Sequence, residues 1–282
     1  MPVVATSIAV VCVIGVGLLL YPQVAAWFTQ YEQSMRIDEY ARDIRDLGAD
    51  TLQEELDRAR EYNVGITGGA EVAANERLPL ADPSGETSEY GSVLRADADG
   101  LMARLKIPAI ALDLPIYHGT DETVLHRGVG HLEGTAVPAG GASTHSVLTA
   151  HRGLATAELF THLDQVEEGD TFTIEVFGDV LAYRVVDTRV VEPEDTESLL
   201  PVQGEDLMTL VTCTPLGVNS HRILVTGERV IPTPDEDIAD AGRRPDIPTF
   251  PWWAVIAAGT LLVTGLYVWA SGRPPGARRV RS

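Results

Sequence analysis

Two long apolar runs lie near the two ends of the chain. Residues 3–21 carry no charge, the first charged residue is Glu32, and residues 251–270 are also uncharged. Each run is long enough to cross a bilayer as a helix. The second run has aromatic residues at both ends, where the membrane interfaces are expected. The pattern therefore predicts an N-terminal transmembrane helix at 1–23 and a C-terminal one at 250–271.

The basic tail after the second run, residues 272–282, contains four arginines and no acidic residue. The positive-inside rule therefore places the C-terminus in the cytoplasm, and two spans place the N-terminus there too. We expect a protein of the plasma membrane whose two spans enclose an extracytoplasmic catalytic domain. A cleaved signal peptide is the alternative for the first run, but only a weak cleavage site follows it, within residues 21–26.

The sequence after the first run changes to helix-forming residues and then becomes irregular. Residues 30–63 carry Glu, Arg, Ala, Leu and Gln at helical spacing and predict a lead-in of two helices, near 31–46 and 50–62. Residues 64–95 are rich in Gly, Asn, Pro and Ser and show no periodicity. Such a stretch inside a compact chain is typical of a linker or of a segment that covers a functional site.

Short strands dominate from residue 101 onward, and turn residues separate them. The eight segments are residues 103–107, 114–117, 128–132, 146–150, 171–176, 181–191, 207–213 and 221–227. Phe177-Gly178-Asp179-Val180 is typical of a hairpin turn, and one helix is expected at 156–162. Closely spaced strands predict a mainly β fold, with a closed or nearly closed antiparallel barrel over 96–231. Prolines and acidic residues make 232–249 a spacer to the second run.

The region between the apolar runs is strongly acidic. It contains all 41 acidic residues but, without the four arginines of the tail, only 17 of the 21 basic ones, which gives a net charge of −24. A surface of this charge repels the phosphate backbone, so nucleic acid is excluded as a partner. Simple solubility also accounts for the acidity.

Cys213 is the only cysteine outside the apolar runs, since Cys12 lies within the first. No disulfide can form in the outer region, and an unpaired thiol in an oxidising compartment is unusual unless it has a function. Cys213 ends an apolar strand and precedes Pro215 and Gly217, which break the pattern. A thiol at a strand end can be held rigidly and still be reached, so Cys213 is a candidate nucleophile. A buried, unreactive cysteine is the alternative.

A cysteine nucleophile needs a nearby cation or base to supply thiolate. His151 ends the apolar strand 146–150 just before a glycine turn, and Arg222 begins the strand that follows Cys213. Strand ends on one rim of a barrel converge, so His151 can meet Cys213 and Arg222 there. The other histidines that the pattern leaves open for this role are His131, His145 and His221.

A zinc site built from His145, His151 and Cys213 is not favoured. The chain has no His-x-x-x-His or Cys-x-x-Cys pair, so we assign no metal and no other cofactor. Arg152 and His221 are expected to be exposed groups at loops or strand ends.

Three motifs occur at separate places in the chain: Thr149-Ala-His151-Arg-Gly153, Thr209-Leu-Val-Thr-Cys213 and Arg222. They resemble the histidine segment, the Thr-Leu-x-Thr-Cys signature and the arginine of the sortases, specifically the pilus-building class C sortases of Gram-positive bacteria. Pro115-Ile-Tyr-His-Gly119 and Gly130-His-Leu-Glu-Gly134 also resemble this class. The resemblance implies an eight-stranded sortase-type barrel with N-terminal helices, a lid and two transmembrane helices.

The resemblance also implies residue roles. The catalytic residues would be Cys213, His151 and Arg222, and Thr209, Leu210 and Thr212 of the same signature are assigned to substrate binding. Asp82-Pro83 looks like the lid motif of the family, although Ser84 stands where the family has an aromatic residue. We assign these three residues to a lid. When it is shut, Asp82 is expected to pair with Arg222.

The implied activity is that of a cysteine transpeptidase. It would cleave a Leu-Pro-x-Thr-Gly-like sorting motif between Thr and Gly, form a thioacyl enzyme, and join the product to a lysine amine of another pilin subunit. The implied partners are pilins or surface proteins that carry this motif. The alternatives are a housekeeping sortase that anchors proteins to peptidoglycan, a secreted cysteine peptidase, and an inactive tethered interaction domain. The second span and the lid-like motif favour pilus assembly.

Overall fold

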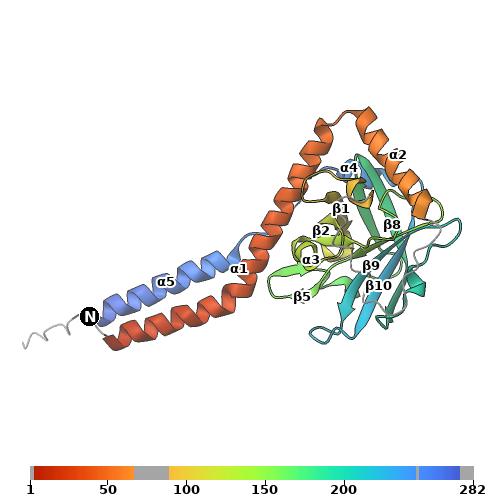
Figure 1. The fold of residues 1–282 in the computed structure, drawn as a ribbon. Coiled ribbons are helices and arrows are strands. Elements are labelled where there is room, and N and C mark those ends of the chain that lie inside the picture. Colours follow the sequence, from red (N-terminus) through yellow and green to blue (C-terminus); the bar gives the residue numbers. More distant parts are fainter. Residues whose placement is uncertain (1–2, 67–88, 246–247, 274–282) are drawn as a thin grey trace, which may run out of the picture.

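The computed structural model describes residues 3–66, 89–245 and 248–273. Eight strands of this part close into a barrel in the order β1-β2-β3-β4-β9-β10-β8-β7 (Figure 1). They are β1 (Leu101–Ile107), β2 (Leu112–His118), β3 (Val129–His131), β4 (Thr144–Thr149), β7 (Thr171–Val176), β8 (Asp179–Val191), β9 (Asp206–Thr214) and β10 (His221–Arg229). The eight-stranded barrel predicted from the sequence is confirmed.

The barrel is mixed, whereas the sequence predicted an antiparallel one. Strand β2 runs parallel to β3, and β4 runs parallel to β9. The other neighbouring pairs are antiparallel. A parallel pair needs a long connection, and here the chain between β4 and β9 forms β5, β6, β7 and β8. The antiparallel prediction was wrong because apolar alternation shows where strands are but not which strands become neighbours.

Apolar side chains from alternate strand positions fill the barrel. Fully buried examples are Leu105, Ile116, Ile174, Leu210 and Val225. The predicted hairpin turn joins β7 to β8, and its two central residues, Phe177 and Gly178, both have positive φ angles. A two-residue turn of this kind matches the right-handed twist of the strands it connects.

The expected helix at 156–162 does not form. Strands β5 (Arg152–Leu154) and β6 (Ala157–Leu159) pair there as a separate two-stranded sheet, in which Leu154 lies opposite Ala157. Pairing with a neighbouring strand has overridden a weak local helix preference. The remaining short elements are η2 (Tyr90–Ser92), η3 (Pro108–Ile110), α3 (Glu122–Arg127), η4 (Leu163–Gln165), η5 (Glu197–Leu199) and α4 (Asp235–Asp240).

The first helix, α1 (Val3–Asp46), is longer than either helix predicted in its place. It continues from the apolar run into the lead-in without a break, although it contains Pro22. Its last turns pack on the barrel, where the hydroxyl of Tyr40 donates to the carbonyl of Met102 at 3.2 Å. The second lead-in helix is α2 (Ala49–Ile66).

Helices α1 and α5 (Trp252–Ser271) are each long and apolar enough to cross a membrane. They lie side by side and antiparallel, so the start of α1 and the end of α5 are at the same end of the molecule (Figure 1). An aromatic contact fixes the base of this pair: the ring of Trp27 lies 6.0 Å from that of Trp253, and its indole N–H donates to the carbonyl of Thr249 at 2.8 Å. The arrangement is compatible with membrane anchoring through two helices.

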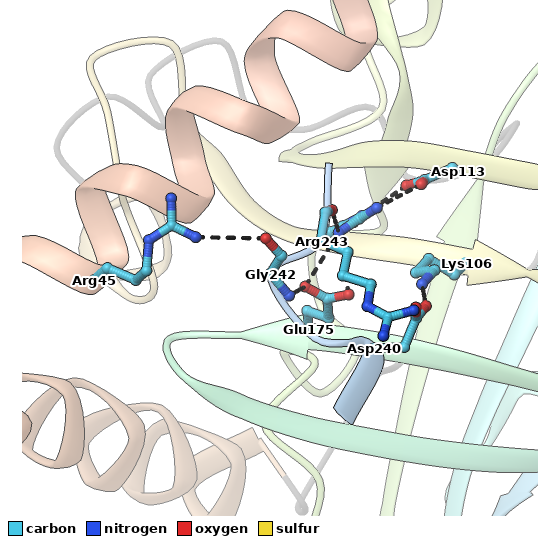
Figure 2. A network of polar contacts seen from close by, with 8 residues as sticks. Arg45, Lys106, Asp113, Glu175, Asp240, Gly242 and Arg243 are labelled. Carbon is cyan, nitrogen blue, oxygen red and sulfur yellow. Dashed lines mark hydrogen bonds and ion pairs between the residues drawn. The ribbon is translucent and has the colours of Figure 1, made fainter. Parts of the chain in front are cut away.

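The stretch expected to be a spacer, 232–249, is bonded to the barrel in its described part (Figure 2). Arg104 of β1 donates to the carbonyl of Arg243 at 2.8 Å, and the backbone N–H of Gly242 donates to Glu175 of β7 at 2.9 Å. These bonds hold Gly242 and Arg243 against the barrel.

Candidate functional site

Cys213 lies one residue before the end of β9, where the strand leaves the core. Residues 207–212 are buried, Cys213 and Thr214 are partly buried, and the loop that follows is exposed. The thiol is therefore held by the sheet on one side and can be reached from the other, which suits an attacking group.

The parallel pairing of β4 with β9 brings His151 to this point. Thr149 lies opposite Val211, and continuing the register by two residues places the backbone of His151 beside that of Cys213. Thr212 holds the two segments together, because its hydroxyl donates at 2.8 Å to the carbonyl of the residue before His151. The two predicted catalytic residues therefore come from adjacent strand ends on one rim.

Arg222 completes the group from the other side. It lies directly opposite Cys213 in the antiparallel pair of β9 and β10. Its Nη1 donates to the carbonyls of Asn219 and His221, each at 3.0 Å. Its Nε is buried and has no hydrogen-bond partner among the described residues. A buried donor without a partner is costly unless something accepts from it, so this N–H is available to an oxygen of a bound substrate.

The side chains of this group are directed to other partners. Nε2 of His151 lies 3.1 Å from Oε2 of Glu122 on α3. In the described part of the chain, no hydrogen bond joins Cys213 to His151 or to Arg222. The backbone register brings the three residues to one rim of the barrel.

Thr209, Leu210 and Thr212, which the sequence assigned to substrate binding, are buried in this structure. Their exposed fractions are 0%, 0% and 1%. Thr209 contacts His145 at 2.7 Å and the hydroxyl of Thr226 at 2.8 Å. Leu210 belongs to the core inside the barrel, whereas Thr209 lies on the other face of β9 and bonds to β4 and β10.

The other histidines considered for catalysis have structural positions. Burial lowers the pKa of His131 to about 4, and its Nε2 contacts the carbonyl of Ala136 at 2.8 Å. Burial also lowers the pKa of His145, whose Nδ1 contacts the carbonyl of Leu200 at 3.0 Å. His221 is 41% exposed at its side chain, as expected. His131 and His145 are therefore neutral groups of the core.

Arg152 was expected to be exposed, but its side chain is only 8% exposed. It pairs with Asp164 at 2.7 Å and donates to the hydroxyl of Thr214 at 2.9 Å. Because Arg152 follows His151 and Thr214 follows Cys213, this bond ties together the two ends of the site. In the sequence, this role of Arg152 could have been suspected because a basic residue directly follows the candidate histidine.

The lid residues Asp82, Pro83 and Ser84 lie outside the described residues, and so does the expected contact of Asp82 with Arg222.

Comparison with known proteins agrees with the motifs. Residues 105–230 match the model of the sortase domain. Sortase D of Bacillus subtilis (strain 168) is 30% identical over 129 residues, which are 45% of this chain and 62% of that protein. The chain thus spans less than two thirds of the length of this curated relative.

Two solved structures are more similar in sequence to this chain than sortase D is. Sortase C-1 from Actinomyces oris is 49% identical, with a TM-score of 0.58, over 64% of this chain and 98% of that one. Streptococcus pneumoniae Sortase C, whose substrates are pilins, is 40% identical, with a TM-score of 0.60, over 70% of this chain and 96% of that one.

Proposed function

The chain belongs to the sortase family, and we propose that it is a membrane-anchored cysteine transpeptidase that polymerises pilins. In this proposal it cleaves a Leu-Pro-x-Thr-Gly-like motif between Thr and Gly and joins the threonyl group to a lysine amine of another subunit. The observation that carries the proposal is the register of β4, β9 and β10, which sets Cys213 between His151 and Arg222. The similarity to class C sortases supports pilins as the substrates.

In the first step, the thiolate of Cys213 attacks the threonyl carbonyl carbon. The carbonyl oxygen becomes an oxyanion, and the Nε–H of Arg222, which has no partner among the described residues, would donate to it or to the bound peptide. The tetrahedral intermediate collapses, the C–N bond to glycine breaks, and the leaving amine takes a proton from the imidazolium of His151. The products are a thioester on Cys213 and a free glycine amine.

In the second step, the lysine amine attacks the thioester carbonyl. The amine gives up a proton to the now neutral imidazole of His151, the C–S bond breaks, and the thiolate of Cys213 is restored. The new bond is an isopeptide. Since the thiolate and the imidazolium return unchanged, the cycle needs no metal and no cofactor.

Two hydrogen bonds, one buried and one partly buried, support this positioning of the reacting groups. Thr212 ties the end of β4 to β9, and Arg152 ties the residue next to His151 to the residue next to Cys213. We assign both to positioning, because their bonds are made to the protein itself. The segment with Asp82, Pro83 and Ser84 is proposed to act as the lid over this rim. If Asp82 holds it shut, Asp82→Ala should make Cys213 react faster with a thiol probe, and an unchanged rate would count against the lid.

The proposed topology places the barrel outside the plasma membrane and both termini in the cytoplasm. It rests on the antiparallel pair of α1 and α5 and on the arginine-rich tail. In a Cys213→Ala background, which removes the native outer thiol, a cysteine placed in the tail should be labelled by a membrane-impermeant maleimide only after the cells are opened. Labelling of this cysteine in intact cells would contradict the proposed topology.

The experiment that tests the activity uses the full chain in detergent micelles. It is mixed with a Leu-Pro-x-Thr-Gly peptide and followed by intact mass spectrometry, with Cys213→Ala as the control. We expect a thioacyl adduct on the wild type alone, together with the released glycine fragment. If the adduct is absent, the experiment is repeated with residues 67–88 deleted, and failure of that protein too would favour an inactive interaction domain.

The acceptor separates the proposed function from its alternatives. A lysine-bearing pilin fragment and a peptidoglycan stem peptide are offered together to the thioacyl enzyme. Transfer to the pilin lysine supports pilus polymerisation, whereas preferential transfer to the stem peptide indicates a housekeeping sortase. Release to water with both acceptors present indicates a peptidase.

A further inference from the structure

Three side chains that can bind a metal meet beside the catalytic rim. Glu122 and His126 lie one turn apart on α3, and His151 follows β4. Oε2 of Glu122 lies 3.1 Å from Nε2 of His151 and 3.6 Å from Nε2 of His126. One ligand atom from each residue lies within 4.8 Å of the other two. This set differs from the zinc site of His145, His151 and Cys213 that the sequence suggested and did not favour.

The separations agree with tetrahedral zinc coordination. Bonds from zinc to imidazole nitrogen and carboxylate oxygen are about 2.0–2.1 Å long, so two ligand atoms of a tetrahedral site lie roughly 3.3 Å apart. The two measured separations, 3.1 and 3.6 Å, fall on either side of this value. Two histidines and a glutamate form a ligand set that zinc uses in proteins, with water in the fourth position. Glu122 and His126 are exposed at 76% and 56%, so water can reach that position.

The ligands come from elements that are fixed independently. Asp121 caps α3, and its carboxylate accepts from the backbone N–H groups of Thr123 at 2.8 Å and Val124 at 3.1 Å. The cap keeps the two helix ligands on one face, because residues four apart lie above one another. His151 is held by its own carbonyl, which accepts from the N–H of Phe160 at 3.1 Å. Binding then needs only small side-chain rotations.

We propose that Glu122, His126 and His151 form a site for Zn²⁺ or a similar transition-metal ion, and that its occupancy reversibly inhibits the enzyme. Imidazole ligands select such ions over Mg²⁺ and Ca²⁺, which prefer oxygen. When Nε2 of His151 is bonded to the metal, this nitrogen has no free lone pair to accept a proton and carries no proton to deliver. The metal site stands on geometry alone, whereas the inhibition rests on the proposed function of His151.

The binding test uses the full chain in detergent micelles, freed of metal with a chelator. Zn²⁺ is titrated by calorimetry, and Co²⁺ serves as a probe whose visible absorption reports tetrahedral coordination. We expect one equivalent of either ion and none of Mg²⁺. His126→Ala and Glu122→Gln should each weaken Zn²⁺ binding at least about tenfold, since even changes outside the ligand shell often cost about 10–100-fold. Absence of Zn²⁺ binding to the wild type would overturn the proposal.

Two controls identify the site. His221 forms a similar exposed pair, its Nε2 lying 3.3 Å from Oε1 of Glu192, but it belongs to no group of three ligands found in the described residues. His221→Ala should therefore bind Zn²⁺ as the wild type does. Cys213→Ala should also retain binding, and the Co²⁺ form of the wild type should lack a thiolate charge-transfer band. Binding that is lost in Cys213→Ala and kept in His126→Ala would place the metal on the cysteine and overturn the assignment.

The activity test distinguishes the two parts of the proposal. Zn²⁺ should suppress transpeptidation by the wild type, and chelator should restore it. His126→Ala should turn over normally and resist Zn²⁺ at concentrations that inhibit the wild type. Equal inhibition of both proteins would refute the inhibitory role. A wild type that binds Zn²⁺ at this site but never transfers a peptide would refute the proposed function and support the metal site.

Discussion

Arg104→Met is expected to destabilise the barrel more than any loss of a surface ion pair. The side chain of Arg104 is only 2% exposed and contacts two carboxylates that are themselves 13% and 12% exposed. Its Nε and Nη2 donate to Asp113 at 2.7 and 2.5 Å, and its Nη1 lies 3.2 Å from Glu175. Figure 2 shows both acids with the backbone of Gly242 and Arg243. One guanidinium thus joins three strands and the segment before the second apolar helix.

The expected loss of stability follows from the two carboxylates that the substitution leaves without a cation. Burial alone would lower the pKa of Arg104, but the hydrogen bond and charge of Asp113, with those of Glu175, raise it above its ordinary value. Methionine fills much of the same volume, so the main loss is the cation between two nearly buried carboxylates. Removing one partner of a buried ion pair costs about 3–5 kcal/mol. This is a large part of the roughly 5–15 kcal/mol that a typical domain has.

The assay is urea denaturation of the full chain in micelles, with Arg36→Met as the matched control. Arg36 pairs with Glu39 and Asp99, but these side chains are 42–55% exposed, so its loss should cost no more than about 1 kcal/mol. Adding Asp113→Asn and Glu175→Gln to Arg104→Met should recover part of the stability, because the uncompensated charges are gone. Equal free energies of unfolding for Arg104→Met and Arg36→Met would refute the reasoning.

Three other changes test single contacts. Because the pKa of His131 falls from its ordinary 6.5 to about 4 in the folded chain, protonation favours unfolding as the pH drops from 6.5 to 4. The loss in free energy of unfolding reaches about 3 kcal/mol. Denaturation at pH 7 and at pH 4.5 should show a smaller loss between the two pH values for His131→Gln than for the wild type. Gly130→Ala should abolish folding, since its Cβ would lie 2.4 Å from the carbonyl oxygen of Gly119. Gly48→Ala, whose Cβ would have nothing within 4 Å, should be tolerated. Far-UV circular dichroism of the two variants checks this difference. Thr212→Val should lower kcat about tenfold or more with little change in KM, because misplacing the reacting groups slows the chemical step; Thr212→Ser should restore it.

The sequence predicted the strands better than the helices, for a physical reason. Each of the eight barrel strands buries apolar side chains, and burial leaves a pattern that can be read directly. The continuity of α1 through Pro22 left no such pattern, since proline usually ends a helix. The docking of Arg243 and Gly242 on the barrel could not be predicted either. It depends on a backbone carbonyl and a backbone N–H, which every residue of a spacer carries.

The candidate site depends on strand direction, which the sequence did not predict. His151 follows the end of β4, and Cys213 lies one residue before the end of β9. If β4 and β9 were antiparallel neighbours, as in the predicted barrel, these ends would lie on opposite rims. The parallel pair puts them on the same rim, and the antiparallel β10 brings the start of its strand, Arg222, to the same place. Register matters as much as direction, because a slip of one residue turns every side chain to the other face. The buried bond from Thr212 to the end of β4 opposes such a slip, so the residues behind the site determine whether its reacting groups can meet.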